Sequence, residues 1–88
     1  MYKLHFTKEA AKDAKKVKKS LLQDKVDSLL NILEINPFQD PPPVKKLVGK
    51  LHGTYSRRIT LQHRLLYQVD VKTKKIKILR MWSHYGDN

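Results

Sequence analysis

The side chains best suited to chemistry are cationic and gather in the second half of the chain. The set is Lys45, Lys46, Lys50, Arg57, Arg58, His63, Arg64, Arg80, His84 and Tyr85. Guanidinium groups hold phosphates through paired hydrogen bonds, and an imidazole exchanges protons near neutral pH. Such groups can cleave RNA without a metal. A base removes the proton of a ribose 2′-OH, cations stabilise the phosphate, and an acid protonates the leaving 5′-oxygen.

The sequence gives little support for metal-dependent catalysis or for a serine or cysteine nucleophile. The four histidines, at positions 5, 52, 63 and 84, have no helix-face spacing, and Asp40, Asp70 and Asp87 are the only carboxylates after Glu34. That is too few and too scattered for a two-metal nuclease. The chain has no cysteine, and no glycines of a nucleophile elbow surround Ser56 or Ser83. The sequence therefore predicts a site without metal or cofactor.

The charge is unevenly distributed. The 88 residues carry a formal net charge of +11. Residues 44–88 hold eleven Lys and Arg against Asp70 and Asp87, a net charge of +9, whereas residues 1–43 carry +2. An excess confined to one half indicates a polyanionic partner, nucleic acid first and an acidic protein second.

Length and hydropathy predict the kind of domain that carries these residues. Eighty-eight residues suit one small domain, which we expect to span residues 1–88. No apolar run approaches the roughly 20 residues of a membrane span, and the N-terminus lacks the long apolar stretch of a signal peptide. We therefore expect a soluble cytoplasmic protein without a membrane partner.

The apolar periodicity predicts the order βααβββ. A strand is expected at Tyr2–Phe6, where apolar residues alternate, followed by a helix over Lys8–Lys19 and a second helix that ends at Asn36-Pro37. Pro37–Pro43 reads as a stiff connector. Three more strands follow, at Tyr55–Leu61, Arg64–Val71 and Lys75–Trp82. We predict an α+β fold in which a two-helix hairpin covers one face of a mostly antiparallel four-stranded sheet.

The strand period separates two neighbouring arginines. Because successive side chains of a strand point to opposite faces, Arg57 and Arg58 cannot share one. If Ile59 and Leu61 face the helices, Arg58 lies on the open face and Arg57 nearer the helices or an edge. His63 is expected to form a structural hydrogen bond in a turn.

The segment from Gly53 to Val69, which contains Ser-Arg-Arg-Ile and His-Arg-Leu-Leu-Tyr, resembles the YoeB/Txe toxins of the RelE superfamily. The closing Met81-Trp-Ser-His-Tyr85 and the Asn36-Pro37-Phe38 helix stop extend the likeness over nearly the whole chain. The resemblance implies the toxin half of a bacterial toxin–antitoxin operon. It also implies a ribosome-dependent endoribonuclease that cuts mRNA in the A site, without metal, and leaves a cyclic phosphate.

The same resemblance implies roles for single residues. Arg64 matches the arginine that stabilises the scissile phosphate, and Arg58 matches a phosphate contact. His84 matches the proposed general acid, and Tyr85 the tyrosine that contacts or orients the substrate. Further contacts to RNA are expected from Lys46, Lys50 and Arg57.

One position departs from the family pattern. Relatives carry a glutamate, the proposed general base, where this chain has Lys45. Three hypotheses follow: Lys45 acts as the base, as lysines do in RelE-type relatives; His84 or His63 takes the role with reduced activity; or the protein is a weakened toxin that still binds ribosome and antitoxin. Deprotonating a lysine near neutral pH costs roughly 4–5 kcal/mol, and neighbouring cations reduce that cost.

The resemblance implies partners as well. These are mRNA and ribosomal RNA, and an acidic, partly disordered antitoxin that covers the basic face. Operator DNA would be bound only through the antitoxin. Relatives commonly form homodimers, a state that the sequence leaves open. The alternative to an enzyme is an antitoxin-binding, co-repressing module with little catalytic activity.

Overall fold

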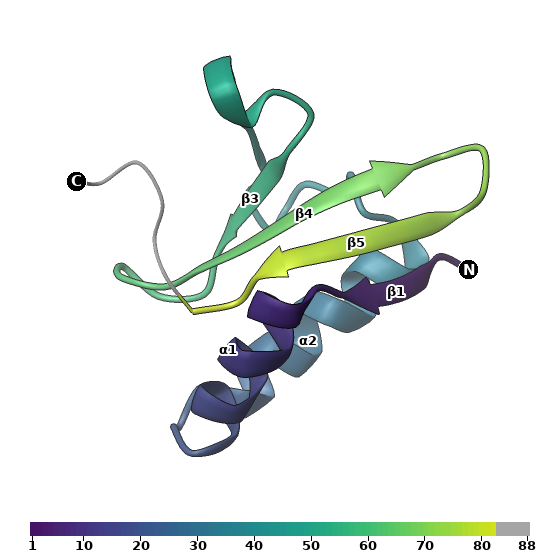
Figure 1. The fold of residues 1–88 in the computed structure, drawn as a ribbon. Coiled ribbons are helices and arrows are strands. Elements are labelled where there is room, and N and C mark those ends of the chain that lie inside the picture. The colour runs from purple at the N-terminus through teal and green to yellow at the C-terminus, as the bar shows by residue number, and fades with distance from the viewer. Residues whose placement is uncertain (83–88) are drawn as a thin grey trace.

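A computed structural model describes residues 1–82 as two helices and a five-stranded sheet. The elements are β1 (Lys3–Phe6), α1 (Lys8–Lys18), α2 (Gln23–Ile35), β2 (Lys45–Lys46), the 3₁₀ helix η1 (Gly49–Leu51), β3 (Tyr55–Arg58), β4 (Arg64–Asp70) and β5 (Lys75–Arg80). The sheet order is β1-β5-β4-β3-β2, and β1 pairs parallel with β5 while the other pairs are antiparallel (Figure 1). The α+β class is confirmed, and the elements predicted as βααβββ all appear in that order, with one further short strand, β2, after the helices.

The short strand β2 is an addition to the four strands expected from the sequence. Lys45 pairs with Ser56 and Lys46 with Tyr55, so β2 forms the edge of the sheet beside β3. Because β2 has only two residues and follows a run of prolines, it lacks the alternation of apolar and polar side chains that reveals longer strands. The pairing fixes Lys45 at a defined place next to β3.

The helices form because capping and apolar spacing agree. Thr7 caps α1, its Oγ1 accepting a hydrogen bond from the Ala10 N–H at 3.1 Å, and Glu9 lies in the first turn, where the helix dipole favours an acid. The buried positions of α1 are Ala10, Asp13 and Val17. Those of α2 are Val26, Leu29 and Leu33.

The hydrophobic core lies between these helices and one face of the sheet. On the sheet side it contains Leu65 and Tyr67 of β4 and Ile76 and Ile78 of β5, each 0% exposed. These side chains recur at every second position, as expected of the face that the helices cover, and Leu66 on the other face of β4 is also buried, at 2% exposed. The predicted helical layer over one face is therefore confirmed (Figure 1).

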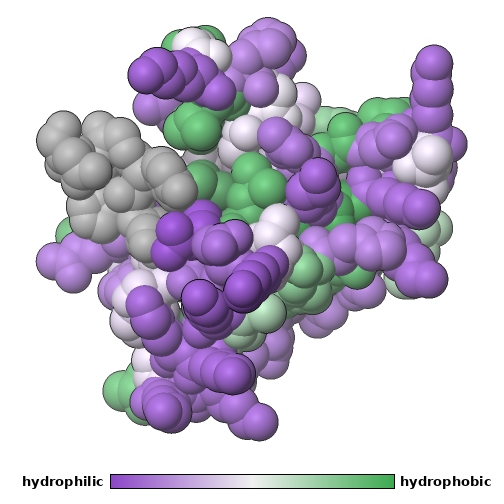
Figure 2. All heavy atoms as spheres, in the orientation of Figure 1, coloured by the Kyte–Doolittle hydropathy of each residue, from purple (hydrophilic) through white to green (hydrophobic). Residues whose placement is uncertain are grey.

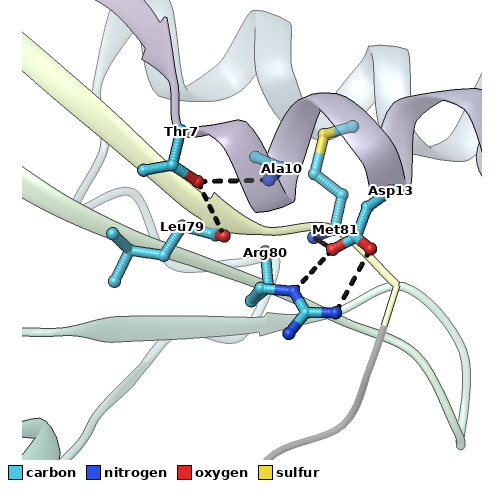
Figure 3. Close-up of polar contacts among 6 residues, drawn as sticks. All are labelled: Thr7, Ala10, Asp13, Leu79, Arg80 and Met81. Carbon is cyan, nitrogen blue, oxygen red and sulfur yellow. Dashed lines mark hydrogen bonds and ion pairs between the residues drawn. The ribbon is translucent and has the colours of Figure 1, made fainter.

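A buried ion pair attaches α1 to the end of β5 (Figure 3). Asp13 is 1% exposed, and its Oδ2 accepts hydrogen bonds from Arg80 Nε at 2.7 Å and from the Met81 N–H at 3.0 Å. Burial by itself would raise the pKa of Asp13, but the hydrogen bonds from Arg80 and Met81 outweigh it and hold the pKa below the usual value. The native state therefore favours the ionised carboxylate.

Neither helix within residues 1–82 has the length and apolar character that crossing a bilayer requires.

We predict that Asp13→Asn lowers the free energy of unfolding at pH 7 by about 2–4 kcal/mol, because Arg80 loses a buried ionic partner. A carboxyl group with a lowered native pKa contributes stability above its unfolded pKa, near 4, and loses that contribution as the pH falls through the native value. The difference between wild type and variant should therefore be constant from pH 7 to about 5 and shrink below about pH 4. Urea unfolding over this pH range measures it.

Asp40→Asn is the matched control, since Asp40 is exposed. It should unfold within about 0.5 kcal/mol of wild type at every pH. A loss of the same size in both variants would contradict a special role for the Asp13–Arg80 pair.

Candidate active site

The pairing of β3 with β4 separates Arg57 from Arg58. Arg58 lies opposite Arg64, and Arg57 lies opposite the core residue Leu65. Directly opposed residues of an antiparallel pair point to the same face, so Arg58 and Arg64 share the open face and Arg57 faces the helices. This confirms the separation predicted from the strand period.

Arg58 and Arg64 line a groove that also contains Lys45. The groove has a volume of about 510 Å³. Its charged lining comes from four elements: Lys25 of α2, Lys45 of β2, Arg58 of β3 and Arg64 of β4. The remaining lining residues are Leu29, Pro42, Pro43, Val44, Leu47 and Ser56. None of these described lining residues carries a carboxylate, so the groove suits an anion such as a phosphate.

Arg64 is held in place by the turn that precedes it. Its Nη1 donates to the carbonyl oxygens of Thr60 at 2.7 Å, Leu61 at 3.1 Å and His63 at 3.2 Å. A guanidinium has five N–H donors in a rigid planar fork. Anchoring one nitrogen therefore orients the whole group at the edge of the groove.

His63 stabilises the same turn, as expected. Its Nδ1 lies 2.7 Å from Thr60 Oγ1, and its ring packs against Trp82 with 4.4 Å between centroids. His63 is not among the residues that line the groove. The structure therefore gives no support to His63 as the general base.

The prediction that Arg57 contacts RNA is wrong, because its side chain is 1% exposed. Its Nε donates to Tyr67 Oη at 3.0 Å, and its Nη atoms donate to the carbonyls of Pro42 at 2.8 Å, Gln39 at 2.8 Å and Pro37 at 3.0 Å. The connector after α2 belongs to no helix or strand, so its buried carbonyls need donors from elsewhere. Arg57 supplies them.

Tyr67 completes this arrangement below the connector. Its hydroxyl donates to the Pro37 carbonyl at 2.7 Å. Burial raises the pKa of Tyr67, and the Arg57 guanidinium partly offsets the rise. The phenol therefore remains a donor at physiological pH. Together Arg57 and Tyr67 fix the segment that leads into β2 and so fix Lys45.

Other predicted site residues lie elsewhere. Lys46 pairs with Tyr55, whose ring packs on the buried Tyr67, so Lys46 faces away from the groove. Lys50 lies on η1 and does not line the groove. His84 and Tyr85 lie outside the described residues. Conversely, Lys25 lines the groove but was missed in the sequence, where it is a single lysine on α2 far from the basic half.

Within residues 1–82, no three His, Asp or Glu side chains come close enough together to hold a metal ion.

The fold and the groove define a small, basic α+β domain with a cationic cleft at the β2 edge of its sheet, between that edge and α2. The family model for the YoeB-like toxin of bacterial type II toxin–antitoxin systems matches residues 6–85. The chain therefore belongs to the YoeB-like toxin family. No curated protein matches its sequence significantly.

Solved structures agree with this assignment. A YoeB/ParE toxin from Agrobacterium tumefaciens is 26% identical with a TM-score of 0.87, over 94% of this chain and 99% of that one. A heterotetrameric YoeB–YefM toxin–antitoxin complex from Staphylococcus aureus contains a chain that is 32% identical with a TM-score of 0.81, over 97% and 99%. A YoeB dimer from the same organism is 31% identical with a TM-score of 0.79, over 96% and 98%.

The two neighbouring arginines allow a matched test of their different environments. Arg57→Met should lower the free energy of unfolding by about 3–5 kcal/mol, because buried carbonyls and the Tyr67 hydroxyl lose a charged donor. Arg58→Met removes the same group from an exposed position and should change it by about 0.5 kcal/mol or less. Urea unfolding of both variants measures the difference. Equal losses would refute the structural assignment of Arg57.

Proposed function

We propose that the protein is a ribosome-dependent mRNA endoribonuclease, the toxin of a type II toxin–antitoxin system, acting in the cytoplasm as one domain over residues 1–88. The observation that carries this proposal is the convergence of Lys45, Arg58 and Arg64 on one groove that, within residues 1–82, has no lining carboxylate. Membership of the YoeB-like toxin family supports the reaction class.

The chemistry requires four roles. A base takes the proton from the ribose 2′-OH, whose oxygen attacks the adjacent phosphorus. Arg64 and Arg58 stabilise the charge that develops on the phosphoryl oxygens. The bond to the 5′-oxygen breaks, and His84 donates the proton that this oxygen needs. The products are a 2′,3′-cyclic phosphate and a free 5′-hydroxyl, with Tyr85 orienting the substrate.

We assign the base to Lys45. Its pairing with Ser56 brings it into the groove beside Arg58 and Arg64. Its place in the family pattern is that of the glutamate proposed as base in relatives. A neutral amine at this position would take the 2′-OH proton directly.

The antitoxin is the second proposed partner. An acidic segment that covers the groove would neutralise its cations and exclude mRNA, and operator DNA would be bound through the antitoxin. The YoeB–YefM complex from S. aureus supports an antitoxin partner, and the YoeB dimer from that organism supports a homodimer.

Cleavage of mRNA on programmed ribosomes tests the assignment. His84→Ala should lower the rate by about 10²–10⁴-fold through loss of the acid. Arg64→Ala should lower it by about 10²–10³-fold through loss of phosphate stabilisation. Lys72→Ala, on the turn between β4 and β5, is the control and should cleave like wild type. Equal rates in wild type and His84→Ala would overturn the site.

The pH dependence identifies the base. A lysine base and a histidine base place the rising limb of the pH–rate profile at different pH values, because their unperturbed pKa values differ by about 4. Lys45→Ala should abolish the limb that belongs to the base. An unchanged profile in Lys45→Ala would refute the lysine assignment.

The replacement of the family glutamate by Lys45 favours one alternative, a weakly active module for antitoxin binding and co-repression. Induced expression without antitoxin separates the two functions. If the protein is an active toxin, expression of the wild type arrests growth. If it is a weak module, only expression of the Lys45→Glu variant arrests growth.

A further inference from the structure

Helix α1 presents an almost purely basic surface opposite its buried face. The six lysines on this surface are Lys8, Lys12, Lys15, Lys16, Lys18 and Lys19, all exposed, with Lys19 as the C-cap. Against them stands one exposed acid, Glu9, since Asp13 is buried with Arg80. Within residues 1–82 no ion pair involves these lysines. In Figure 2 the lower part of the molecule, where Figure 1 places α1 and part of α2, is mostly hydrophilic, with a small hydrophobic patch at its lower left.

Four of the lysines form a straight row. Residues 8, 12, 15 and 19 fall within roughly 60° of one another around a helix with 3.6 residues per turn, directly opposite Ala10, Asp13 and Val17. The row is about 16 Å long. We call it the α1 lysine row. The helix that carries it is held in place, because α1 is fixed to the sheet by Val17 in the core and by Asp13 at β5.

The close spacing of the lysines works against the stability of the helix, although Lys15, Lys16 and Lys18 lie in its last turn, where the helix dipole favours cations. Six lysine pairs on α1 lie three or four residues apart, and like charges at these spacings repel. Lys8 also stands in the first turn, where the helix dipole disfavours a cation. Glutamines at the same positions would keep the helix and remove the repulsion. A bound polyanion would relieve the repulsion. Solubility alone does not require the lysines to stand so close together, whereas binding of a polyanion does.

The chemistry of the row favours a phosphate backbone over a protein. Residues 8–19 contain no aromatic side chain and no large apolar residue on the exposed side, whereas protein interfaces combine charge with aromatic or apolar anchors. Single-stranded RNA is held by stacking on aromatic rings. A duplex hides its bases and displays regularly spaced phosphates, which lysines contact without stacking.

The row is separate from the groove. Lys45 and Arg58 lie on β2 and β3 at one side of the sheet, with Arg64 on the neighbouring β4 and Lys25 on α2, whereas α1 is attached to β5, beside the opposite edge strand β1. An RNA bound by the row would therefore not be the strand in the groove.

We propose that the α1 lysine row is a docking surface for the phosphate backbone of double-stranded ribosomal RNA, separate from the mRNA groove. This deepens the proposed function and rests on it for the identity of the RNA. The row holds the toxin on a ribosomal duplex while the groove receives the single-stranded message.

The test compares two variants of equal net charge. One replaces Lys8, Lys12, Lys15 and Lys19 by glutamine. The matched control replaces four lysines outside α1, Lys3, Lys72, Lys75 and Lys77, by glutamine. Fluorescence anisotropy measures binding of a blunt RNA duplex of about 20 base pairs and of a poly-glutamate peptide as a function of salt. Co-sedimentation measures binding to ribosomes without mRNA.

The α1 variant should bind the duplex and the ribosome at least about tenfold more weakly than wild type at 0.1 M salt. Its slope of log affinity against log salt should be smaller by about 3–4, the value for four lost phosphate contacts. The control should keep most of the wild-type slope. The melting temperature of the α1 variant should lie within about 5 °C of that of wild type, because relieved repulsion and lost dipole interactions offset each other, and this shows that misfolding is not the cause.

Three outcomes would overturn the proposal. They are an unchanged duplex affinity in the α1 variant, an equal loss in the control variant, and a loss of poly-glutamate binding while duplex binding persists. The last outcome would assign the row to an acidic protein. Duplex binding is measured without cleavage. If the protein fails to cut mRNA, the proposed function is refuted, but the duplex-binding test of the α1 lysine row still applies.

Discussion

Arg57 donates hydrogen bonds from inside the protein to three carbonyls of the connector between α2 and β2. Burying a cation is costly unless its donors are satisfied, and here carbonyl dipoles and the Tyr67 hydroxyl satisfy them. The same bonds remove the cost of burying the connector's own acceptors. The connector therefore has one fixed path, and β2 with Lys45 follows directly from it. The segment from Pro42 to Lys45 lines one side of the groove, and the buried Arg57 fixes this segment by its hydrogen bond to the Pro42 carbonyl.

On the open face of the sheet, in contrast to the buried Arg57, two cations lie close to each other. Arg58 and Arg64 stand opposite each other across β3 and β4, and like charges in such positions repel. Lys25 and Lys45 add to the same potential. Where stability is the requirement, the chain pairs a cation with a carboxylate, as in Asp13 and Arg80. Within residues 1–82 the cations of the groove have no carboxylate partner, so a bound anion would relieve their repulsion, which folding itself does not.

The two cationic surfaces differ in construction and therefore in what they suit. The groove is concave and draws on separate elements, and one of its arginines is oriented by turn carbonyls. This construction suits a single phosphate held at a reacting position. The α1 lysine row is convex, regular and built from flexible side chains, which suits a backbone contacted without sequence preference. The ribosome-dependent nuclease proposed above would use both surfaces.

The sequence by itself determined the order of elements, the helical layer over one sheet face and the separation of Arg57 from Arg58. These features follow from spacings of two to four residues, because side-chain direction in a helix or strand is a local property. It also predicted Arg58, Arg64 and Lys45 as site residues, through motifs that resemble those of the family, and the structure brings the three together in one groove. The tertiary structure decided the rest: that β2 forms, that Lys25 enters the groove, and that Arg57 is a structural residue and not a contact to RNA. The bonds of Arg57 to the connector join residues 15 to 20 positions apart. No local spacing encodes such contacts, since they depend on how a connector without periodicity packs against a sheet that must form together with it.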